Sequence, residues 1–289
     1  MARHNTIVLE EPRDAQFSRM LNQEIGIDEY LQNLDIAYPI FSRGMCELMQ
    51  QLAAQGKQIL QAEPYLDTLV SIHEFFADGG SPAKLPANTL CQRVYALEKL
   101  TTAALLNFYE ISVSKPFDAV VESVRQFARQ DAARFRLRDE LRAQVLVPLV
   151  EKNTGIFIES GLMHYGLRGL IQKQMSEPQR MQTVFLADNI LRRHGLKGRL
   201  YGPGDCLTLL YIFHPQLSWP TFENLLAARA LVYNRLCPQD ELAVGGKMPH
   251  LKNELACIEQ VSRLTFEECR RLYRKFRKTG HSDGAYILK

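Results

Sequence analysis

Polar side chains with acid–base character follow three short apolar runs of the sequence. The candidates at these positions are Glu10, Glu11, Arg13, Glu63, Tyr65, His164 and Tyr165. Carboxylates and imidazoles are common general acids and bases, and both can bind a divalent metal. The residue types therefore suggest either acid–base catalysis or a metal site, with Glu10 and His164 as the predicted metal ligands.

The runs that must position these side chains are predicted to be β-strands. They cover residues 6–10, 57–63 and 156–160, are rich in apolar residues, and stop near prolines or glycines. Runs without polar alternation are typical of parallel strands that are buried on both faces. Because ligands bind beyond the carboxyl ends of such strands, we expect a polar pocket at that edge of the sheet.

Each of these residues also has a simpler interpretation. A glutamate at a strand end can be a solvated charge, or it can stabilise the N-terminus of the following helix. A single histidine such as His164 can be a hydrogen-bonded core residue. The functional interpretation depends on the convergence of several such groups, because perturbed ionisable residues cluster at functional sites.

Arg138 and Asp139 lie in the charged part of a long predicted helix over residues 116–152. They could point into the same cleft as the strand-end residues. The alternative is a solvated helix face on which Asp139 pairs with Arg142 at i,i+3 spacing, and the spacing alone favours this alternative.

The pattern along the chain predicts a helix-rich α/β fold, with a small parallel or mixed sheet flanked by helices. Further helices are expected at 14–55 with breaks, 88–112, 167–174 and 182–194, with a short strand at 199–201. The last third is predicted to be helical, and Asp205 is expected to cap one helix. We expect an α/β core over residues 1–175 and a mainly helical region over 176–289 that packs on it.

Composition limits the classes of partner. The 289 residues carry a net charge of +3, from 35 basic and 32 acidic side chains, which is too small to indicate nucleic acid as a partner. The sequence contains no apolar run of membrane-spanning length and no secretory leader, so a cytoplasmic protein is expected. The six cysteines are scattered and are interpreted as buried thiols rather than as redox or zinc residues.

A basic segment, Arg270–Lys278, lies near the C-terminus. Its interleaved Leu272, Tyr273 and Phe276 predict a helix that packs its apolar face and solvates its charges. Contact with nucleic acid or with an anionic surface is the alternative. Thr265 and Glu268 have capping-box spacing and predict the start of this helix.

The order of these segments resembles the TraB/Tiki-like superfamily, which includes ChaN-like and erythromycin-esterase-like proteins. The resemblance covers about residues 5–172. It rests on three stretches: Ile7–Arg13, Arg138–Asp139 with the apolar residues that follow, and Ile156–His164 with its Gly-x-x-His ending.

The resemblance implies a mixed α/β sandwich in which Glu10 or Glu11, Arg13, Arg138, Asp139 and His164 surround one cleft. The family places another Gly-x-x-His strand earlier in the chain. In this sequence only Met1–Asn5 precede Thr6, so the resemblance lacks that strand. A metal-dependent peptidase of the Tiki type is not implied by the remaining stretches alone.

Two functions remain open from the sequence. One is a hydrolase-like or metal-assisted enzyme that uses the strand-end residues on a small molecule or peptide. The other is a binding module for a protein or for a small molecule such as haem, with His164 or Tyr165 as the axial ligand. The sequence also leaves a homodimer open.

Overall fold

The computed structural model divides into two compact units, each described here by itself. Unit 1 comprises Met1–Ala96 and Arg136–Thr183, and unit 2 comprises Leu97–Phe135 and Val184–Lys289. The structure describes residues 4–32, 34, 36–153, 155–177, 179–193, 195, 197, 200–216, 218–237 and 248–279.

A three-stranded parallel sheet forms the centre of unit 1. Its strands are β1 (Thr6–Leu9), β2 (Gln58–Gln61) and β3 (Ile156–Ile158), in the order β2-β1-β3. Thr6 pairs with Gln58 on one side and with Ile156 on the other. Both neighbours run parallel to β1, so the three carboxyl ends share one edge, and the prediction of a small sheet in a helix-rich fold is confirmed.

The central strand β1 is buried on both faces, as its continuous apolar sequence predicts. Ile7 and Leu9 face a core built with α1 (Ala15–Leu21), α2 (Ile27–Gln32) and α3 (Pro39–Ala54). Val8 faces the opposite core, which includes Ala143 and Leu167.

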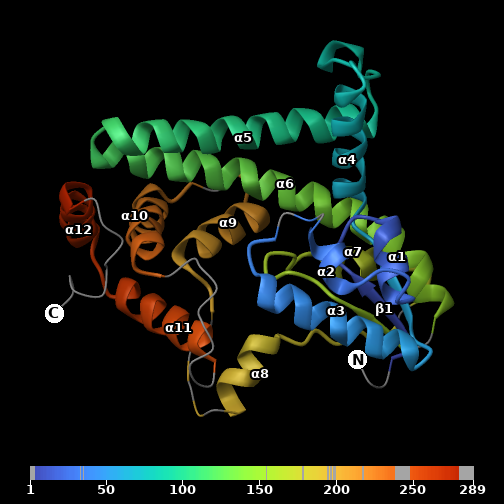
Figure 1. Ribbon diagram of the computed structural model, residues 1–289. Helices are drawn as coiled ribbons and strands as arrows, with labels where there is room; N and C mark the ends of the chain where they lie inside the picture. The colour runs from blue at the N-terminus through green and yellow to red at the C-terminus, as the bar shows by residue number, and fades with distance from the viewer. Residues whose placement is uncertain are drawn as a thin grey trace. The chain divides into compact units, whose positions relative to one another are not determined.

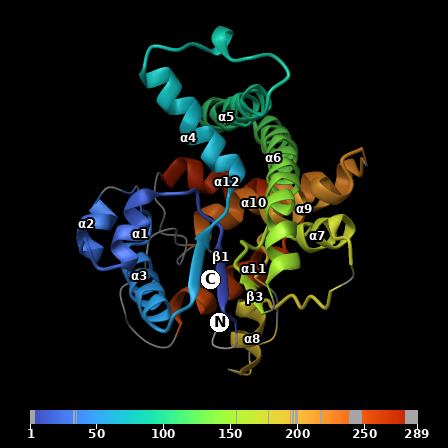
Figure 2. The same ribbon diagram turned by 90° about the vertical axis from the view of Figure 1, so that its right-hand side faces the viewer.

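These two cores cover opposite faces of the sheet, as Figures 1 and 2 show. The second one is formed by the C-terminal part of α6 (Phe117–Lys152) and by α7 (Leu167–Gln174). Unit 1 is therefore a sheet between two helical layers. Its remaining helices are α4 (Pro64–Ala77), a 3₁₀ turn at Pro82–Lys84, and the start of α5 (Leu90–Ser114).

In its described part, unit 2 contains helices joined by loops and no strand. It contains the remainder of α5 and α6, together with α8 (Leu186–Arg193), α9 (Pro203–Phe213), α10 (Pro220–Leu236), α11 (Pro249–Ser262) and α12 (Phe266–Thr279). The helix α10 packs against α9, α11 and α12. Within the described ranges, no helix is both long enough and apolar enough to cross a bilayer.

Helix α12 corresponds to the predicted basic segment. The hydroxyl of Thr265 accepts from the backbone N–H of Glu268, and the Glu268 carboxylate accepts from the backbone N–H of Thr265, which is the predicted capping box. Tyr273 and Phe276 are buried, whereas Arg274 is exposed. The helix therefore packs its apolar face, as expected.

One local prediction differs from the structure. The predicted strand at 199–201 is absent at Leu200 and Tyr201, while Arg199 lies outside the described residues. Leu200 instead packs in a helical cluster with Leu191. Asp205 caps α9 as expected, and it does so from the first turn of the helix, where its carboxylate accepts a hydrogen bond from the backbone N–H of the N-cap residue Gly202 at 2.8 Å.

The two units also divide the chain differently from the expected regions 1–175 and 176–289. Residues 97–135, which were expected in the first region, belong to unit 2. The reason is that α5 and α6 are long enough to contribute residues to both units, so a single cut along the sequence cannot separate them.

Candidate functional site

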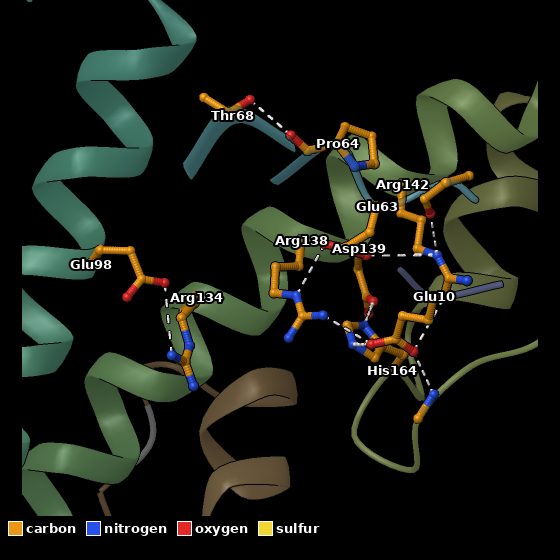
Figure 3. Close-up of polar contacts among 12 residues, drawn as sticks. Glu10, Glu63, Pro64, Thr68, Glu98, Arg134, Arg138, Asp139, Arg142 and His164 are labelled. Atoms are coloured by element: carbon orange, nitrogen blue, oxygen red, sulfur yellow. Dashed lines mark hydrogen bonds and ion pairs between the residues drawn. The ribbon is translucent and has the colours of Figure 1, made fainter. Parts of the chain in front are cut away.

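The edge of the sheet where the strands end carries a connected network of charged side chains (Figure 3). Glu10 directly follows β1, Glu159 directly follows β3, and Glu63 lies two residues beyond β2. Parallel strands bring these three positions to one edge. We call the charged network formed by Glu10, Glu63, Arg138, Asp139, Arg142, Glu159 and His164 the strand-end network.

Arg138 joins two of the strand ends. Its Nε donates to Glu63 Oε1 at 3.1 Å, and its Nη2 donates to Glu10 Oε1 at 2.9 Å. The Arg138 side chain lies on α6 and is 14% exposed, as is that of Glu10, whereas the Glu63 side chain is fully buried. Glu10 and Arg138, together with the partly exposed Glu159, are therefore the members through which the network reaches solvent.

Arg142 lies one helical turn beyond Arg138 and is completely buried. It donates to the Ala62 carbonyl at 3.0 Å, to the Glu159 carbonyl at 2.6 Å, and to Glu10 Oε2 at 3.3 Å. One guanidinium thus contacts the chain just beyond all three strands. Its rigid fork of donors suits this role, which a lysine could not fill.

His164 lies between two carboxylates. Its Nδ1 is 2.5 Å from Asp139 Oδ1, and its Nε2 is 2.7 Å from Glu10 Oε1. The ring and the Asp139 carboxylate are both buried. An imidazole with an acceptor at each nitrogen is best satisfied when both nitrogens carry a proton, so the arrangement favours the imidazolium.

The Gly-x-x-His segment forms a tight turn that brings His164 back to the strand end. The His164 N–H donates to the Gly161 carbonyl at 3.1 Å, and the Gly161 N–H donates to Glu10 Oε2 at 2.5 Å. A side chain at Gly161 would begin 3.4 Å from the Glu10 carboxylate. The motif therefore holds both the backbone and the imidazole against Glu10.

These contacts keep Glu10 ionised. Burial would raise its pKa, but the hydrogen bond and charge of His164, the Gly161 N–H and the charge of Arg142 together lower the pKa to about 2. For His164, burial opposes the charged form, yet the hydrogen bonds with Asp139 and Glu10 outweigh it and raise the pKa above its usual value. The pair thus holds a proton on the ring and a negative charge on Glu10.

The other two strand-end glutamates show the opposite shift. Burial raises the pKa of Glu63 despite the charge and hydrogen bond of Arg138. Burial also raises the pKa of Glu159 despite the Glu10 backbone N–H that its carboxylate accepts. The three strand-end glutamates therefore differ: Glu10 stays ionised, whereas Glu63 and Glu159 hold a proton more readily. Such a division is typical of acid–base sites.

The strand-end network does not fit a divalent metal. Metals need carboxylate oxygens and a neutral imidazole nitrogen that face a common point. Here the oxygens of Glu10 face guanidinium, amide and imidazole donors, and both nitrogens of His164 face carboxylates. Among the described residues, no group of three or more histidines, cysteines, aspartates and glutamates could hold a metal. The metal role expected for Glu10 and His164 is therefore not supported.

A haem ligand does not fit at His164 either, since an axial ligand must present one ring nitrogen to the iron. Both nitrogens are occupied, and the side chain is only 1% exposed. The neighbouring Tyr165 is 48% exposed.

Four of the predicted site residues lie outside the strand-end network. Glu11 is exposed and accepts from Gln61, and Arg13 is exposed and pairs with Asp67. Side chains in succession at a strand end point in different directions, so only Glu10 of this segment turns inward. Tyr65 is fully buried in the first turn of α4, and Tyr165 faces outward.

Two members of the network, Arg142 and Glu159, were not among the predicted site residues. The interpretation of Asp139 and Arg142 as a solvated pair is wrong, because both are buried. Arg138 and Arg142 are four residues apart and share a helix face, which was the available signal. Glu159 directly follows an apolar run, as Glu10 does, and the same rule would have included it.

Two surface hollows lie on other elements. One is lined by Leu31, Ile36 and Ile40, among others, on α2, α3 and the segment between them. The other is lined by Leu209, Phe213 and other residues of α9 and α10. Both are mainly apolar.

Comparison with known proteins finds similarity at the level of sequence. The chain is 29% identical over 275 residues to an uncharacterized protein of Archaeoglobus fulgidus, a match that covers 94% of this chain and 90% of that protein. No family model matches the chain, and no solved structure matches it. The arrangement of the site itself must therefore carry the functional argument.

Proposed function

We propose that the strand-end network is the acid–base centre of a hydrolase-like enzyme that acts without a bound metal. The observation that carries this proposal is His164, which is held between Asp139 and Glu10 while Arg138 and Arg142 form ion pairs with Glu10. A carboxylate that orients an imidazole from one side, with the other nitrogen directed to a reacting group, is the arrangement by which many hydrolases move protons.

In this proposal, Glu10 and Arg138 contact the substrate, because the two paired side chains are each 14% exposed. Water adds to a carbonyl or phosphoryl group, and Arg138 stabilises the negative charge that develops on its oxygen. The proton on His164 passes through Glu10 to the leaving group, and a proton from the attacking water restores the pair. Asp139 orients the ring and stabilises its positive charge.

We also propose that residues 5–172 belong to the TraB/Tiki-like superfamily. Its support is that the three stretches that carry the resemblance contribute Glu10, Arg138, Asp139 and His164 to a single network. Arg13, the fifth residue that the resemblance implied, pairs with Asp67 at the surface. The proposal therefore applies to a site without that arginine and without the earlier Gly-x-x-His strand.

The proposal is tested by hydrolysis of a panel of chromogenic carboxylic and phosphoric esters. We expect His164→Gln and Glu10→Gln each to lower kcat/KM by about 10²–10⁴-fold, the usual contribution of general acid–base catalysis. The control is Glu11→Gln, an identical change at the exposed neighbouring residue, which should retain wild-type activity.

The same panel separates catalysis from a structural role. If wild-type protein hydrolyses a substrate and His164→Gln retains that activity, the network only holds the strand ends together and the proposal fails. If the wild type is inactive on every ester while the folded variants bind a small molecule more weakly, the site is a binding site. Circular dichroism of each variant shows that a lost activity is not a lost fold.

A further inference from the structure

We propose that the exposed face of helix α5 in unit 2 binds the same face of a second copy of this chain, with the two helices antiparallel. This face, which we call the outer face of α5, consists of Lys99, Ala103, Leu106, Glu110 and Val113, with Leu100 and Tyr109 at its two sides. Its large apolar members are more than half exposed: Leu100 by 55%, Leu106 by 61%, Tyr109 by 56% and Val113 by 75%. Single exposed apolar residues are ordinary, but a contiguous apolar surface marks an interaction site.

The opposite face of α5 is already packed within unit 2. Its side chains at positions 97, 101, 105 and 108 are buried or half-buried, and the helix runs alongside α6 (Figures 1 and 2). Glu98 lies 3.7 Å from Arg134 of α6, and the Tyr273 hydroxyl of α12 donates to the Ser112 carbonyl at 3.0 Å. Residues 100–109 include no charged side chain, and a helix that is apolar all round is normally buried all round. The outer face therefore calls for a partner.

The spacing of the outer face indicates that this partner is another helix. Its five central residues follow one another at alternating intervals of four and three positions, from Lys99 to Val113. This alternation is that of a coiled-coil seam, in which the side chains of one helix pack between those of a second helix. At about 1.5 Å per residue, the seam extends over about 20 Å of α5.

The order of the side chains makes the outer face complementary to itself. When two copies run antiparallel about a twofold axis midway between positions 104 and 105, position 103 meets position 106 of the other copy, and position 99 meets position 110. The small Ala103 then faces the large Leu106, and Lys99 faces Glu110 at both ends of the contact. In a parallel pair each charge would instead meet its own counterpart, which repels. The charges therefore select a second copy of the chain in the antiparallel orientation, and twofold pairing of this kind is the commonest form of oligomer.

Sedimentation equilibrium of the full-length protein over a concentration series tests this inference. We expect the wild type to be a dimer. Leu106→Glu should raise the dissociation constant of the dimer at least about 100-fold, because the twofold symmetry buries the new charge twice at the centre of the seam. The matched control is Leu186→Glu in α8, since Leu186 is 64% exposed but lies outside α5. This control should dimerise as the wild type does.

Charge reversal tests the orientation of the two helices. Lys99→Glu alone and Glu110→Lys alone should each weaken the dimer, because each change places like charges opposite one another at both ends of the seam. The double variant Lys99→Glu/Glu110→Lys exchanges the two charges and should dimerise like the wild type. A mixture of the two single variants should form a mixed dimer for the same reason.

Three results would overturn the inference. One is a wild type that stays monomeric throughout the concentration series, which would leave the outer face to a different partner. Another is a Leu106→Glu dimer as tight as that of the wild type, which would place the dimer contact on another surface. The third is a double charge variant that dimerises no better than the single ones, which would contradict the antiparallel pairing. Because the changed side chains are exposed, circular dichroism should show the wild-type fold in every variant.

Discussion

At the scale of single residues, Arg142 is the member of the network whose burial matters most for the stability of the fold. It is completely buried and contacts Glu10 and the carbonyl groups of Ala62 and Glu159. Burial acts to lower its pKa, and the charges of Glu10, Glu63 and Glu159 offset this effect only in part. A buried guanidinium of this kind is stable only while its partners remain, and its partners depend on it equally.

Replacement of Arg142 should therefore unfold the protein more readily. We expect Arg142→Met to reduce the free energy of unfolding by about 3–5 kcal/mol, since it removes a buried charge partner of Glu10 and takes a donor from the carbonyl groups of Ala62 and Glu159. The measurement is urea denaturation followed by circular dichroism. The same change at the exposed Arg168 of α7 should stay within about 0.5 kcal/mol of wild type. Equal losses of unfolding free energy in the two variants would show that the buried contacts of Arg142 do not stabilise the fold.

At the scale of elements, the site depends on the approach of the turn before α7 to helix α6. Asp139 lies on α6, and Gly166 lies at the N-terminus of α7. A Cβ atom at Gly166 would lie 3.2 Å from Asp139 Oδ2, whereas one at Gly169 would meet nothing within 4 Å. Because His164 holds the other oxygen of Asp139, this carboxylate has little room to move away.

Two identical glycine substitutions on this element should have opposite effects. Gly169→Ala should raise the free energy of unfolding by about 0.5–1 kcal/mol, because alanine is the better helix former and the space is open. Gly166→Ala should lower it and should also weaken any activity that depends on Asp139 and His164. Thermal unfolding of both variants is the measurement. A gain of stability at Gly166 equal to that at Gly169 would contradict the close approach.

At the scale of the whole molecule, each of the two units contains a glutamate bound by arginines, which is fully buried in unit 2 and 14% exposed in unit 1. In unit 2, Glu223 on α10 accepts from Arg125 at 2.6 Å, from Arg129 at 2.7 Å and from Tyr211 at 2.7 Å. Although burial would raise its pKa, the Tyr211 hydroxyl and Arg125 lower it to about 2. Glu10 in unit 1 has a pKa of about 2 as well.

Both groups make stability depend on acid pH in the same direction. A folded-state pKa of about 2 lies below the ordinary value of 4.5, so the stabilisation is present above pH 4.5 and is lost as the pH falls toward 2. Each lost contribution is on the order of 3 kcal/mol. We expect the stability difference between wild type and Glu10→Gln, and between wild type and Glu223→Gln, to shrink over this range.

Two probes can follow this pH dependence. Circular dichroism reports on both units, and the fluorescence of the single tryptophan, Trp219, reports on unit 2, because its backbone N–H donates to Glu223 at 2.6 Å. If the stability difference between wild type and each glutamine variant stays constant from pH 5 to pH 2, then Glu10 and Glu223 do not ionise more easily in the folded protein than in the unfolded one.

The sequence was sufficient to predict the sheet and much of the site. Strand-end residues such as Glu10 and Glu63 follow apolar runs, and the carboxyl ends of parallel strands lie at the same edge of the sheet. Burial of Arg142 could not be read in this way, because i,i+3 spacing from Asp139 is equally typical of a solvated helix. Its burial depends on the carbonyl groups of Ala62 and Glu159, which lie just beyond β2 and β3 and are distant from Arg142 in the sequence.

The most direct test of the account is the protonation state of His164. Nitrogen NMR of protein with ¹⁵N-labelled histidine can follow its ring, identified among the seven histidines by the signals missing in His164→Gln. We predict that both ring nitrogens carry protons at neutral pH and that the ring loses one only above pH 6.5, in keeping with its raised pKa. A His164 ring that is neutral at neutral pH, with a titration midpoint at or below pH 6.5, would contradict the proposal that Asp139 and Glu10 hold a protonated imidazole between them.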